Sequence, residues 1–276
     1  MDDPPAWIAE FTVTPRDFTA QLDAVVGCGR TPVPISGLAR HLVHGTALPP
    51  RPVVLTFDDG FADLPGPTAE ALATRALPAT AYLTTGALAT NAPTTNALTP
   101  GSRTGSGSRT GSGCLLPPAP MMTLAQATAL EGYGIEVGAH TVTHPQLDTL
   151  TAPALHRELR QSKSALEDVL GHEVAHLAYP HGYNSRAVRR AAEAAGYASA
   201  VAVRHALSSG RDEPYRIARL IVRRTHTVPD IESWMAGEGA RGERVRVAPF
   251  PDSPATLGWR LYRGARARVR GPEFAG

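Results

Sequence analysis

The chain is short of lysine, cysteine and long apolar runs, and each shortage excludes something. Lys163 is the only lysine among 276 residues, so arginine carries almost all of the positive charge. The two cysteines, Cys28 and Cys114, lie far apart and form no C-x-x-C pair. This predicts two free thiols in a reducing compartment, with a single disulfide left open, and it excludes a disulfide scaffold. No run of about eighteen apolar residues occurs, which excludes a membrane-spanning helix.

The N-terminus also lacks the features of an export signal. Residues 1–5, Met-Asp-Asp-Pro-Pro, are acidic and are not followed by an apolar h-region. A secretory signal peptide needs a positive start and such an apolar stretch. As the chain stands this predicts a cytoplasmic protein, with export if the natural start lies further upstream.

Charge is distributed unevenly along the chain. The net charge is +2, yet the residues from Arg241 onward contain eight arginines and three acidic residues. The tail therefore carries about five positive charges and the remainder is slightly acidic. Leu257, Leu261, Ala265 and Val269 recur every four residues within this tail. That spacing predicts a short basic amphipathic helix, either solvated or lying on an anionic membrane or another polyanion.

Short apolar runs alternate with helical periodicity through most of the chain. Such alternation indicates parallel βαβ units, either in an α/β barrel or in an open doubly wound sheet. Catalytic residues in both folds sit at the C-terminal ends of strands. The expected strands are 52–57, 79–84, 135–139, 174–179, 198–203 and 217–222, and the expected helices are 14–23, 35–44, 67–76, 123–131, 151–170, 185–195 and 228–235.

The composition suggests one main domain with two flanking segments. We expect an N-terminal helical segment over residues 1–50, packed on a barrel over residues 51–236. Two copies of a Gly-Ser-Arg-Thr unit fall within residues 100–114. Such a sequence cannot bury enough surface to fold, so it predicts a flexible, disordered insertion in the barrel. Residues 237–276 form the basic tail.

Two adjacent carboxylates, Asp58 and Asp59, end the first barrel strand and precede Gly60. Neighbouring side chains in a strand point to opposite faces, but this alternation relaxes just past the strand end. The Asp58 and Asp59 side chains could therefore reach the same cleft. An Asp-Asp-Gly turn without chemistry is the alternative. The segment alone does not choose between them.

A pair of histidines, His140 and His144, follows the strand at 135–139. Two histidines and one aspartate make a three-ligand face on a divalent metal and leave positions open for water and substrate. A second carboxylate could then take a proton from the activated water. This favours Asp58 and Asp59 as base and ligand. The similar pairs His41/His44 and His172/His176 are expected to have no such role.

Three ordered motifs carry a resemblance to a known family. Thr56-Phe-Asp-Asp-Gly60, His140-Thr-Val-Thr-His-Pro145 and Ala178-Tyr-Pro-His-Gly182 resemble the successive motifs of the polysaccharide deacetylases. This is the NodB-homology group, carbohydrate esterase family 4, and the similarity covers roughly residues 50–225. The resemblance implies a distorted (β/α) barrel, usually of seven strands. It also implies metal-dependent hydrolysis of N- or O-acetyl groups on carbohydrates; for an N-acetyl group the bond broken is a linear amide that is not a peptide bond.

The resemblance also implies roles for particular residues. Asp59, His140 and His144 would hold the metal, usually Zn²⁺, and Asp58 would be the general base. The third motif would contribute to substrate binding through Tyr179, Pro180 and Gly182. Because Pro180 has no N–H to donate, the backbone N–H of His181 is the better oxyanion donor.

Two departures from the family pattern matter for catalysis. Many members begin the third motif with an arginine that orients the base, whereas this chain has Ala178. The Ala-Tyr-Pro version resembles the poly-N-acetylglucosamine deacetylase branch, in which a later arginine takes that part; Arg219 is our choice and Arg216 the fallback. That branch draws its general acid from a Tyr-His segment upstream of the region matching residues 1–20. As the chain stands it begins at Met1 without that segment. Either the natural start lies further upstream, or another histidine serves, with His226 and His181 as the candidates, or the protein does not turn over.

The sequence thus predicts a carbohydrate deacetylase acting on an acetylated amino sugar or polysaccharide. The alternative is a catalytically impaired, carbohydrate-binding relative that lacks the acid. A two-histidine-one-carboxylate iron oxygenase shares the ligand type but leaves Asp58 and the third motif unexplained. No nucleic-acid recognition motif accompanies the basic tail, so no nucleic-acid partner is expected; peripheral membrane contact through the tail stays open.

Overall fold

A computed structural model describes residues 4–89, 114–239, 246–247 and 254–270. The Gly/Ser-rich insertion predicted at 100–114 lies outside these residues except for Cys114, and so does part of the basic tail. Both cysteines are free thiols. No helix in the described ranges combines the length and apolar character needed to cross a bilayer.

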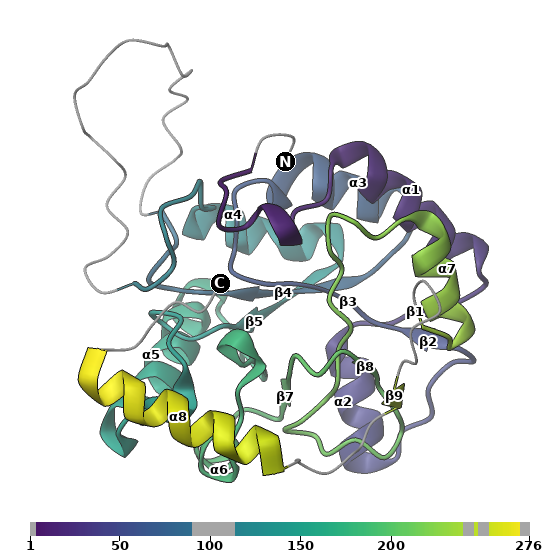
Figure 1. Cartoon of the computed structure of the whole chain (residues 1–276). Coiled ribbons are helices and arrows are strands. Elements are labelled where there is room, and N and C mark those ends of the chain that lie inside the picture. The colour runs from purple at the N-terminus through teal and green to yellow at the C-terminus, as the bar shows by residue number, and fades with distance from the viewer. Residues whose placement is uncertain (1–3, 90–113, 240–245, 248–253, 271–276) are drawn as a thin grey trace.

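A curled, five-stranded parallel sheet forms the centre of the molecule (Figure 1). Its strands follow in chain order, β3-β4-β5-β6-β7, so each crossover returns to the next strand along. β4 is buried at every position, as expected for a parallel strand covered on both faces. The strands are β3 (Leu55–Phe57), β4 (Ala79–Leu83), β5 (Ile135–Ala139), β6 (His176–Ala178) and β7 (Ser199–Val201).

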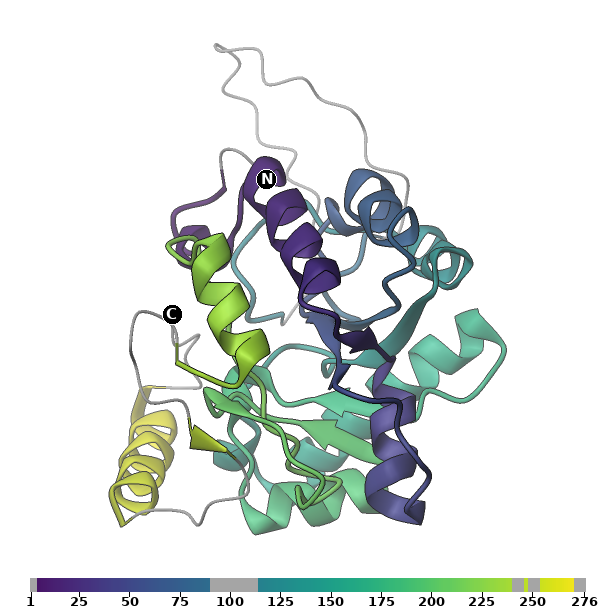
Figure 2. The same ribbon diagram turned by 90° about the vertical axis from the view of Figure 1, so that its right-hand side faces the viewer.

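Helices, short strands and single turns surround this sheet, and together they form an open barrel of the predicted (β/α) type (Figure 2). The α-helices are α1 (Pro15–Gly27), α2 (Ile35–His44), α3 (Ala69–Ala73), α4 (Leu124–Ala129), α5 (Ala152–Leu170), α6 (Arg186–Ala194), α7 (Val228–Ala236) and α8 (Pro254–Arg270). Two-residue strands pair as β1 (Thr31–Pro32) with β2 (Pro52–Val53) and as β8 (Ala206–Leu207) with β9 (Arg246–Val247). Single turns are η1 (Ala9–Phe11), η2 (Leu64–Thr68), η3 (Leu130–Tyr133), η4 (Leu147–Thr149) and η5 (Pro180–Gly182).

Local signals placed most helix ends correctly. Thr14 caps α1 by accepting a hydrogen bond from the Asp17 backbone N–H (3.1 Å), and Pro15 occupies the first helical position. Gly171 ends α5 in the left-handed conformation (φ 77°). Within residues 1–50, α1 packs against α7 of the chain's far end. The N-terminal segment is therefore tied to the barrel by long-range contacts.

Several expected elements are shorter than the sequence pattern suggested, and the strand expected at 52–57 is divided into β2 and β3. Two of the expected elements differ most. The helix expected at 67–76 is reduced to α3, because Pro67 and Thr68 belong to η2 and Ala76 adopts the left-handed conformation (φ 50°) just past the end of α3. The strand expected at 217–222 is reduced to one parallel bridge between Ile217 and Val201. The Ala218 N–H donates to the Asp212 carboxylate (3.1 Å) instead of to a neighbouring strand.

Candidate active site

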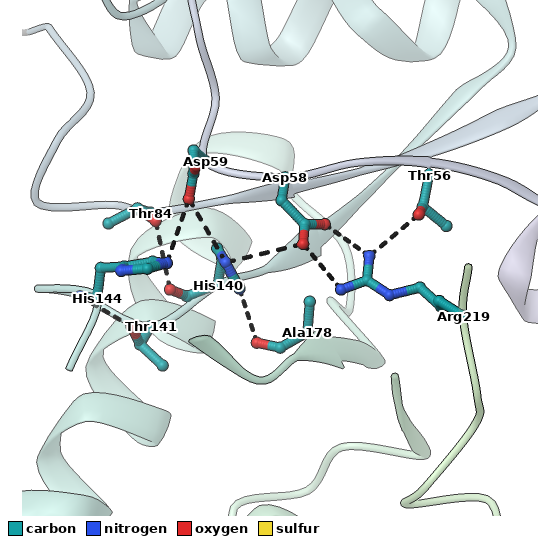
Figure 3. A network of polar contacts seen from close by, with 9 residues as sticks. All are labelled: Thr56, Asp58, Asp59, Thr84, His140, Thr141, His144, Ala178 and Arg219. Carbon is teal, nitrogen blue, oxygen red and sulfur yellow. Dashed lines mark hydrogen bonds and ion pairs between the residues drawn. The ribbon is translucent and has the colours of Figure 1, made fainter. Parts of the chain in front are cut away.

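The predicted site residues gather at the C-terminal edge of the parallel sheet (Figure 3). Asp58 and Asp59 follow β3, and His140 follows β5. Because parallel strands end at the same edge, residues eighty positions apart become neighbours. His144 reaches the same place from the loop that continues from His140.

Asp59, His140 and His144 form a compact cluster. One Asp59 carboxylate oxygen, Oδ1, lies 3.5 Å from His140 Nε2 and 3.4 Å from His144 Nε2. The three candidate ligand atoms all lie within 4.8 Å of one another. The cluster is enclosed, since His140 and His144 are buried and Asp59 is only 9% exposed. One carboxylate and two imidazoles thus converge on a single point.

The second nitrogen of His140 fixes how its ring is presented. Nδ1 lies 2.8 Å from the Ala178 carbonyl oxygen. A carbonyl can only accept, so Nδ1 carries the proton and Nε2 turns its lone pair toward Asp59. A backbone partner of this kind is the usual support of a metal-binding histidine. The ring is therefore oriented for coordination.

A glutamate from α5 holds the loop between the two histidines. The Val142 and Thr143 backbone N–H groups both donate to Glu158 Oε2 (2.9 Å each), and the Thr143 hydroxyl donates to Glu158 Oε1 (2.6 Å). Charge-assisted hydrogen bonds of this type are the stronger ones in proteins. Glu158 thereby fixes the path of the chain from His140 to His144.

The cluster is built on backbone that an ordinary side chain rarely adopts. Asp59 (φ 74°), Thr141 (φ 69°), His144 (φ 60°) and His181 (φ 57°) all lie in the left-handed region. These are four of the seven non-glycine residues with positive φ in the described part of the chain. Such conformations persist where surrounding structure enforces them, often at functional sites.

The residues present fit a bound cation. Among the residues that the structure describes, Asp59 Oδ1 is buried and has no hydrogen-bond partner, and an unsatisfied buried polar atom is costly. Burial raises the pKa of the Asp59 carboxyl to about 6 and lowers the pKa of His144 well below its ordinary value. Neutral imidazoles and a carboxylate are the ligands that borderline divalent metals such as zinc prefer. A divalent ion would supply the partner that Asp59 lacks.

The second carboxylate, Asp58, is held by Arg219. The Arg219 guanidinium donates to both Asp58 oxygens (2.7 and 2.8 Å) and to the Thr56 hydroxyl (3.0 Å). Burial pushes the pKa of Asp58 upward, but the charge of the Arg219 guanidinium and its hydrogen bonds outweigh this effect, so the pKa is lowered. Asp58 Oδ2 also lies 4.0 Å from His140 Nε2. Of the two arginines considered, Arg219 is the one in contact with Asp58.

The third motif lies behind and beside the cluster. Tyr179 is fully buried and its hydroxyl donates to the Tyr215 carbonyl (3.0 Å). Pro180 and Gly182 are also buried, and a Cβ on Gly182 would meet the Val203 backbone nitrogen at 2.4 Å. These residues shape the loop from within, and their contact with a substrate stays a prediction. The partly exposed residue of this motif is His181.

The two candidate acids lie in different surroundings. The His181 ring packs edge-on against His144, with ring centroids 4.7 Å apart. His226 accepts a hydrogen bond from the Arg223 N–H (2.9 Å) and packs against Trp234 of α7. His181 is therefore the candidate that adjoins the metal cluster.

A cleft of about 1260 Å³ contains the cluster and continues toward the N-terminal segment. Asp58, His181 and Arg219 line one part of it, and Trp7 and Phe18 line another. Its volume is slightly above the range of about 300–1,000 Å³ that is usual for small-molecule sites. The cluster is thus accessible from a space that could hold a ligand.

Comparison with known proteins agrees with this geometry. The sequence profile described as polysaccharide deacetylase matches residues 45–200, more than half of the chain. No curated protein matches the sequence. Among solved structures, the deacetylase PplD of Streptococcus pyogenes has a TM-score of 0.68 at 21% identity, covering 82% of this chain and 89% of that one.

Two further structures are similar in fold. IcaB from Ammonifex degensii has a TM-score of 0.63 at 19% identity, covering 81% of this chain and 90% of its own. The deacetylase domain of BpsB from Bordetella bronchiseptica has a TM-score of 0.60 at 20% identity, with coverages of 80% and 88%. These likenesses support the barrel fold, and the profile match identifies the family. The chain belongs to the polysaccharide deacetylase family.

Proposed function

We propose that the chain is a metal-dependent deacetylase that removes N-acetyl, or alternatively O-acetyl, groups from a carbohydrate. One observation carries the proposal: the Asp58–Arg219 ion pair stands directly beside the Asp59–His140–His144 cluster. A ligand set alone would suit many metal proteins. A carboxylate held ionised next to it is what a hydrolase needs to remove a proton from water.

Asp59, His140 and His144 would hold the ion, and we propose zinc because this ligand set with open positions is typical of catalytic zinc. When bound, the ion supplies Lewis acidity, which makes water nucleophilic near neutral pH and polarises a carbonyl group. Asp58 accepts the proton of the attacking water. Arg219 keeps Asp58 ionised and fixes the direction of its oxygens.

The third-motif loop completes the proposed reaction. The His181 backbone N–H donates to the oxygen that becomes negative when water adds to the acetyl carbonyl. Collapse breaks the C–N bond, and a proton must reach the departing nitrogen. The His181 side chain, beside His144, is the proposed donor. The products are acetate and a free amine on the sugar.

The proposal extends to partners. The substrate would be an acetylated amino sugar, free or within a polysaccharide, and the basic tail would contact a membrane surface peripherally. The sugar would enter through the cleft beside His181 and Tyr183.

Acetate release from acetylated amino-sugar oligomers tests the function. Asp58→Asn is expected to lower kcat by about 10²- to 10⁴-fold, because it removes the base while leaving the metal ligands in place. Asp23→Asn is the matched control, since Asp23 also pairs with an arginine, Arg75 (2.7 Å), but on the surface. Equal rates for wild type and Asp58→Asn would refute the mechanism. Sugar binding without acetate release by the zinc-loaded wild type would instead support the impaired relative.

A further inference from the structure

Helix α8 presents apolar side chains to solvent. Trp259 is 50% exposed, Tyr262 55%, Leu261 71% and Val269 83%. They are four of the nine exposed large hydrophobic residues in the described part of the chain. Apolar residues scattered singly on a surface need no explanation, but several on one helix mark an interaction site.

The polar side of α8 faces the protein instead. Arg263 is only 6% exposed and binds the Asp148 carboxylate through two hydrogen bonds (2.9 and 2.8 Å). It also donates to Gln146 (3.1 Å), and its guanidinium lies 3.3 Å from the centre of the Tyr183 ring. A surface helix normally buries its apolar stripe against the core. In α8 an arginine is buried and the apolar stripe is left outside.

The charge of α8 indicates what could cover that stripe. Residues 254–270 contain five arginines and no acidic residue. A helix with exposed tryptophan, leucine and tyrosine among arginines has the composition of an interfacial membrane helix. Anionic headgroups would complement its charge, whereas a second copy would bring further arginines to the same place.

We infer that α8 binds an anionic lipid surface. The stripe of Trp259, Leu261, Tyr262 and Val269 enters the headgroup region, and the positive charge of the helix attracts acidic lipids. The Arg263–Asp148 pair keeps the helix attached to the barrel. Lipid binding by α8 does not require catalysis, so it can be tested independently of the proposed deacetylation.

The position of α8 relates the bound surface to the cleft. The indole N–H of Trp259 donates to the Tyr183 hydroxyl (3.3 Å), and the Tyr183 ring lies 6.0 Å from His181. Figure 1 and Figure 2 show α8, in yellow, on the outside of the molecule. A membrane bound to α8 would therefore adjoin the cleft that Tyr183 lines.

Vesicle cosedimentation of the full chain tests the inference. The probes are vesicles of phosphatidylcholine alone and of phosphatidylcholine with one quarter phosphatidylglycerol, at low and high salt. Wild type is expected to bind the anionic vesicles, more weakly at high salt, and not to bind the neutral ones. Leu261→Ser combined with Val269→Ser should lower the vesicle affinity at least about tenfold, because two apolar anchors are lost.

Val43→Ser combined with Val169→Ser is the control, since these valines are exposed on α2 and α5. The control should bind as wild type does, and circular dichroism should show every variant folded. Failure of the wild type to bind anionic vesicles overturns the inference, as does unchanged binding by the α8 variant. A dimer that the α8 variant abolishes would assign the stripe to a second copy. Retention on an acetylated polysaccharide that only Trp259→Ala abolishes would assign it to a sugar chain.

Discussion

The two ends of the parallel sheet each carry a cluster of histidine and carboxylate, and the two clusters are built in opposite ways. At the C-terminal edge stand Asp59, His140 and His144. At the N-terminal edge stand Glu136, the second residue of β5, and His176, the first residue of β6. Similar residue types therefore occur within one barrel in two settings.

In the N-terminal cluster both residues also form hydrogen bonds with groups outside the histidine–carboxylate pair. His176 Nδ1 lies 2.9 Å from the Ser199 hydroxyl, and His176 Nε2 lies 3.5 Å from Glu136. The other Glu136 oxygen accepts from the Ser36 N–H (3.1 Å) and the Thr80 hydroxyl (3.3 Å). Ser36 lies in the first turn of α2, so Glu136 satisfies a donor that the helix leaves open. This cluster attaches α2 to the sheet.

In the C-terminal cluster, Asp59 Oδ1 lies between the two histidines and accepts no hydrogen bond from the described part of the chain. A protein loses stability by burying such an atom, so its presence requires a reason. The contrast shows that the hydrogen-bond partners of a histidine–carboxylate cluster, rather than its residue types, distinguish a structural cluster from one that could bind a metal. The predictions below test that contrast at both ends of the sheet.

The largest expected effect comes from the same substitution made at each end. His140→Ala should lower kcat/KM about 10³-fold or more, because charge stabilisation and proton transfer at the site both depend on it. His176→Ala should leave the activity of the folded protein near wild type and cost about 2–4 kcal/mol of stability through unsatisfied partners and a small cavity. Acetate release and denaturant unfolding measure the two effects.

Added zinc provides the matched control for that pair. Wild type and His176→Ala should both gain thermal stability with zinc, about 2.7 kcal/mol at a hundredfold excess over Kd. His140→Ala should gain much less. An equal gain in both variants would contradict the assignment of the metal cluster.

A smaller loss is expected from Glu158→Gln. The substitution weakens the acceptor of the Val142 and Thr143 backbone donors and loosens the loop that carries His144. Residues that orient ligands typically contribute 10- to 100-fold to metal affinity, so zinc affinity should fall by about that factor. Competition with a chromogenic chelator measures it. Glu167→Gln, a half-buried glutamate of the same helix paired with Lys163 (2.8 Å), should leave the affinity unchanged.

Acid should destabilise the metal-free protein through buried histidines. Burial lowers the pKa of His176, whereas in the unfolded chain a histidine titrates near 6.5. As pH falls below about 6.5 the unfolded chain binds a proton that the folded chain does not, so stability is lost. The slope is up to about 1.4 kcal/mol per pH unit for each such histidine. Between about pH 6.5 and 5, unfolding in chelator should depend less steeply on pH in His176→Ala than in wild type. If the pH dependence of stability were the same in His176→Ala and in wild type, the pKa of His176 would not be lowered by folding.

The smallest effect is expected at Tyr82, whose ring lies beneath Arg219 of the Asp58–Arg219 pair. Arg219 sits over the Tyr82 ring, 5.6 Å from its centre, while the buried hydroxyl has no hydrogen-bond partner in the described part of the chain. Tyr82→Phe should keep the ring contact and change stability and kcat by little, within about 1 kcal/mol and twofold. Tyr82→Leu removes the π face and should cost more. Equal effects of the two substitutions would show that the ring contact contributes nothing.

Much of the fold could be predicted because the signals are local. The Thr14 cap, the Gly171 stop and the burial of β4 follow from residues close in sequence. The metal cluster could be predicted as well, since Asp59 and the two histidines follow directly on apolar strands. The family resemblance supplied the choice of Arg219, which spacing alone could not have made.

The rest depends on distant partners. Nothing near Glu158 indicates that it holds the loop at Thr143, fifteen residues earlier. The four-residue period over 257–269 predicted an amphipathic helix, and the structure contains α8. It did not predict that Arg263 would face inward, because that depends on Asp148, 115 positions away. The strand expected at 217–222 was too long for a different, local reason, since Asp212, six residues before Ala218, accepts the Ala218 N–H.

The left-handed backbone of the site sets a limit on evolving this protein for heat resistance. Each of Asp59, Thr141, His144 and His181 adopts a conformation that costs an ordinary residue about 1–2 kcal/mol and costs glycine almost nothing. A library selected only for survival at high temperature would therefore favour glycine at these four positions. A variant with glycine in place of Asp59 or His144 would be more heat-resistant but would lack a candidate metal ligand. Activity therefore has to be part of the selection from its first round.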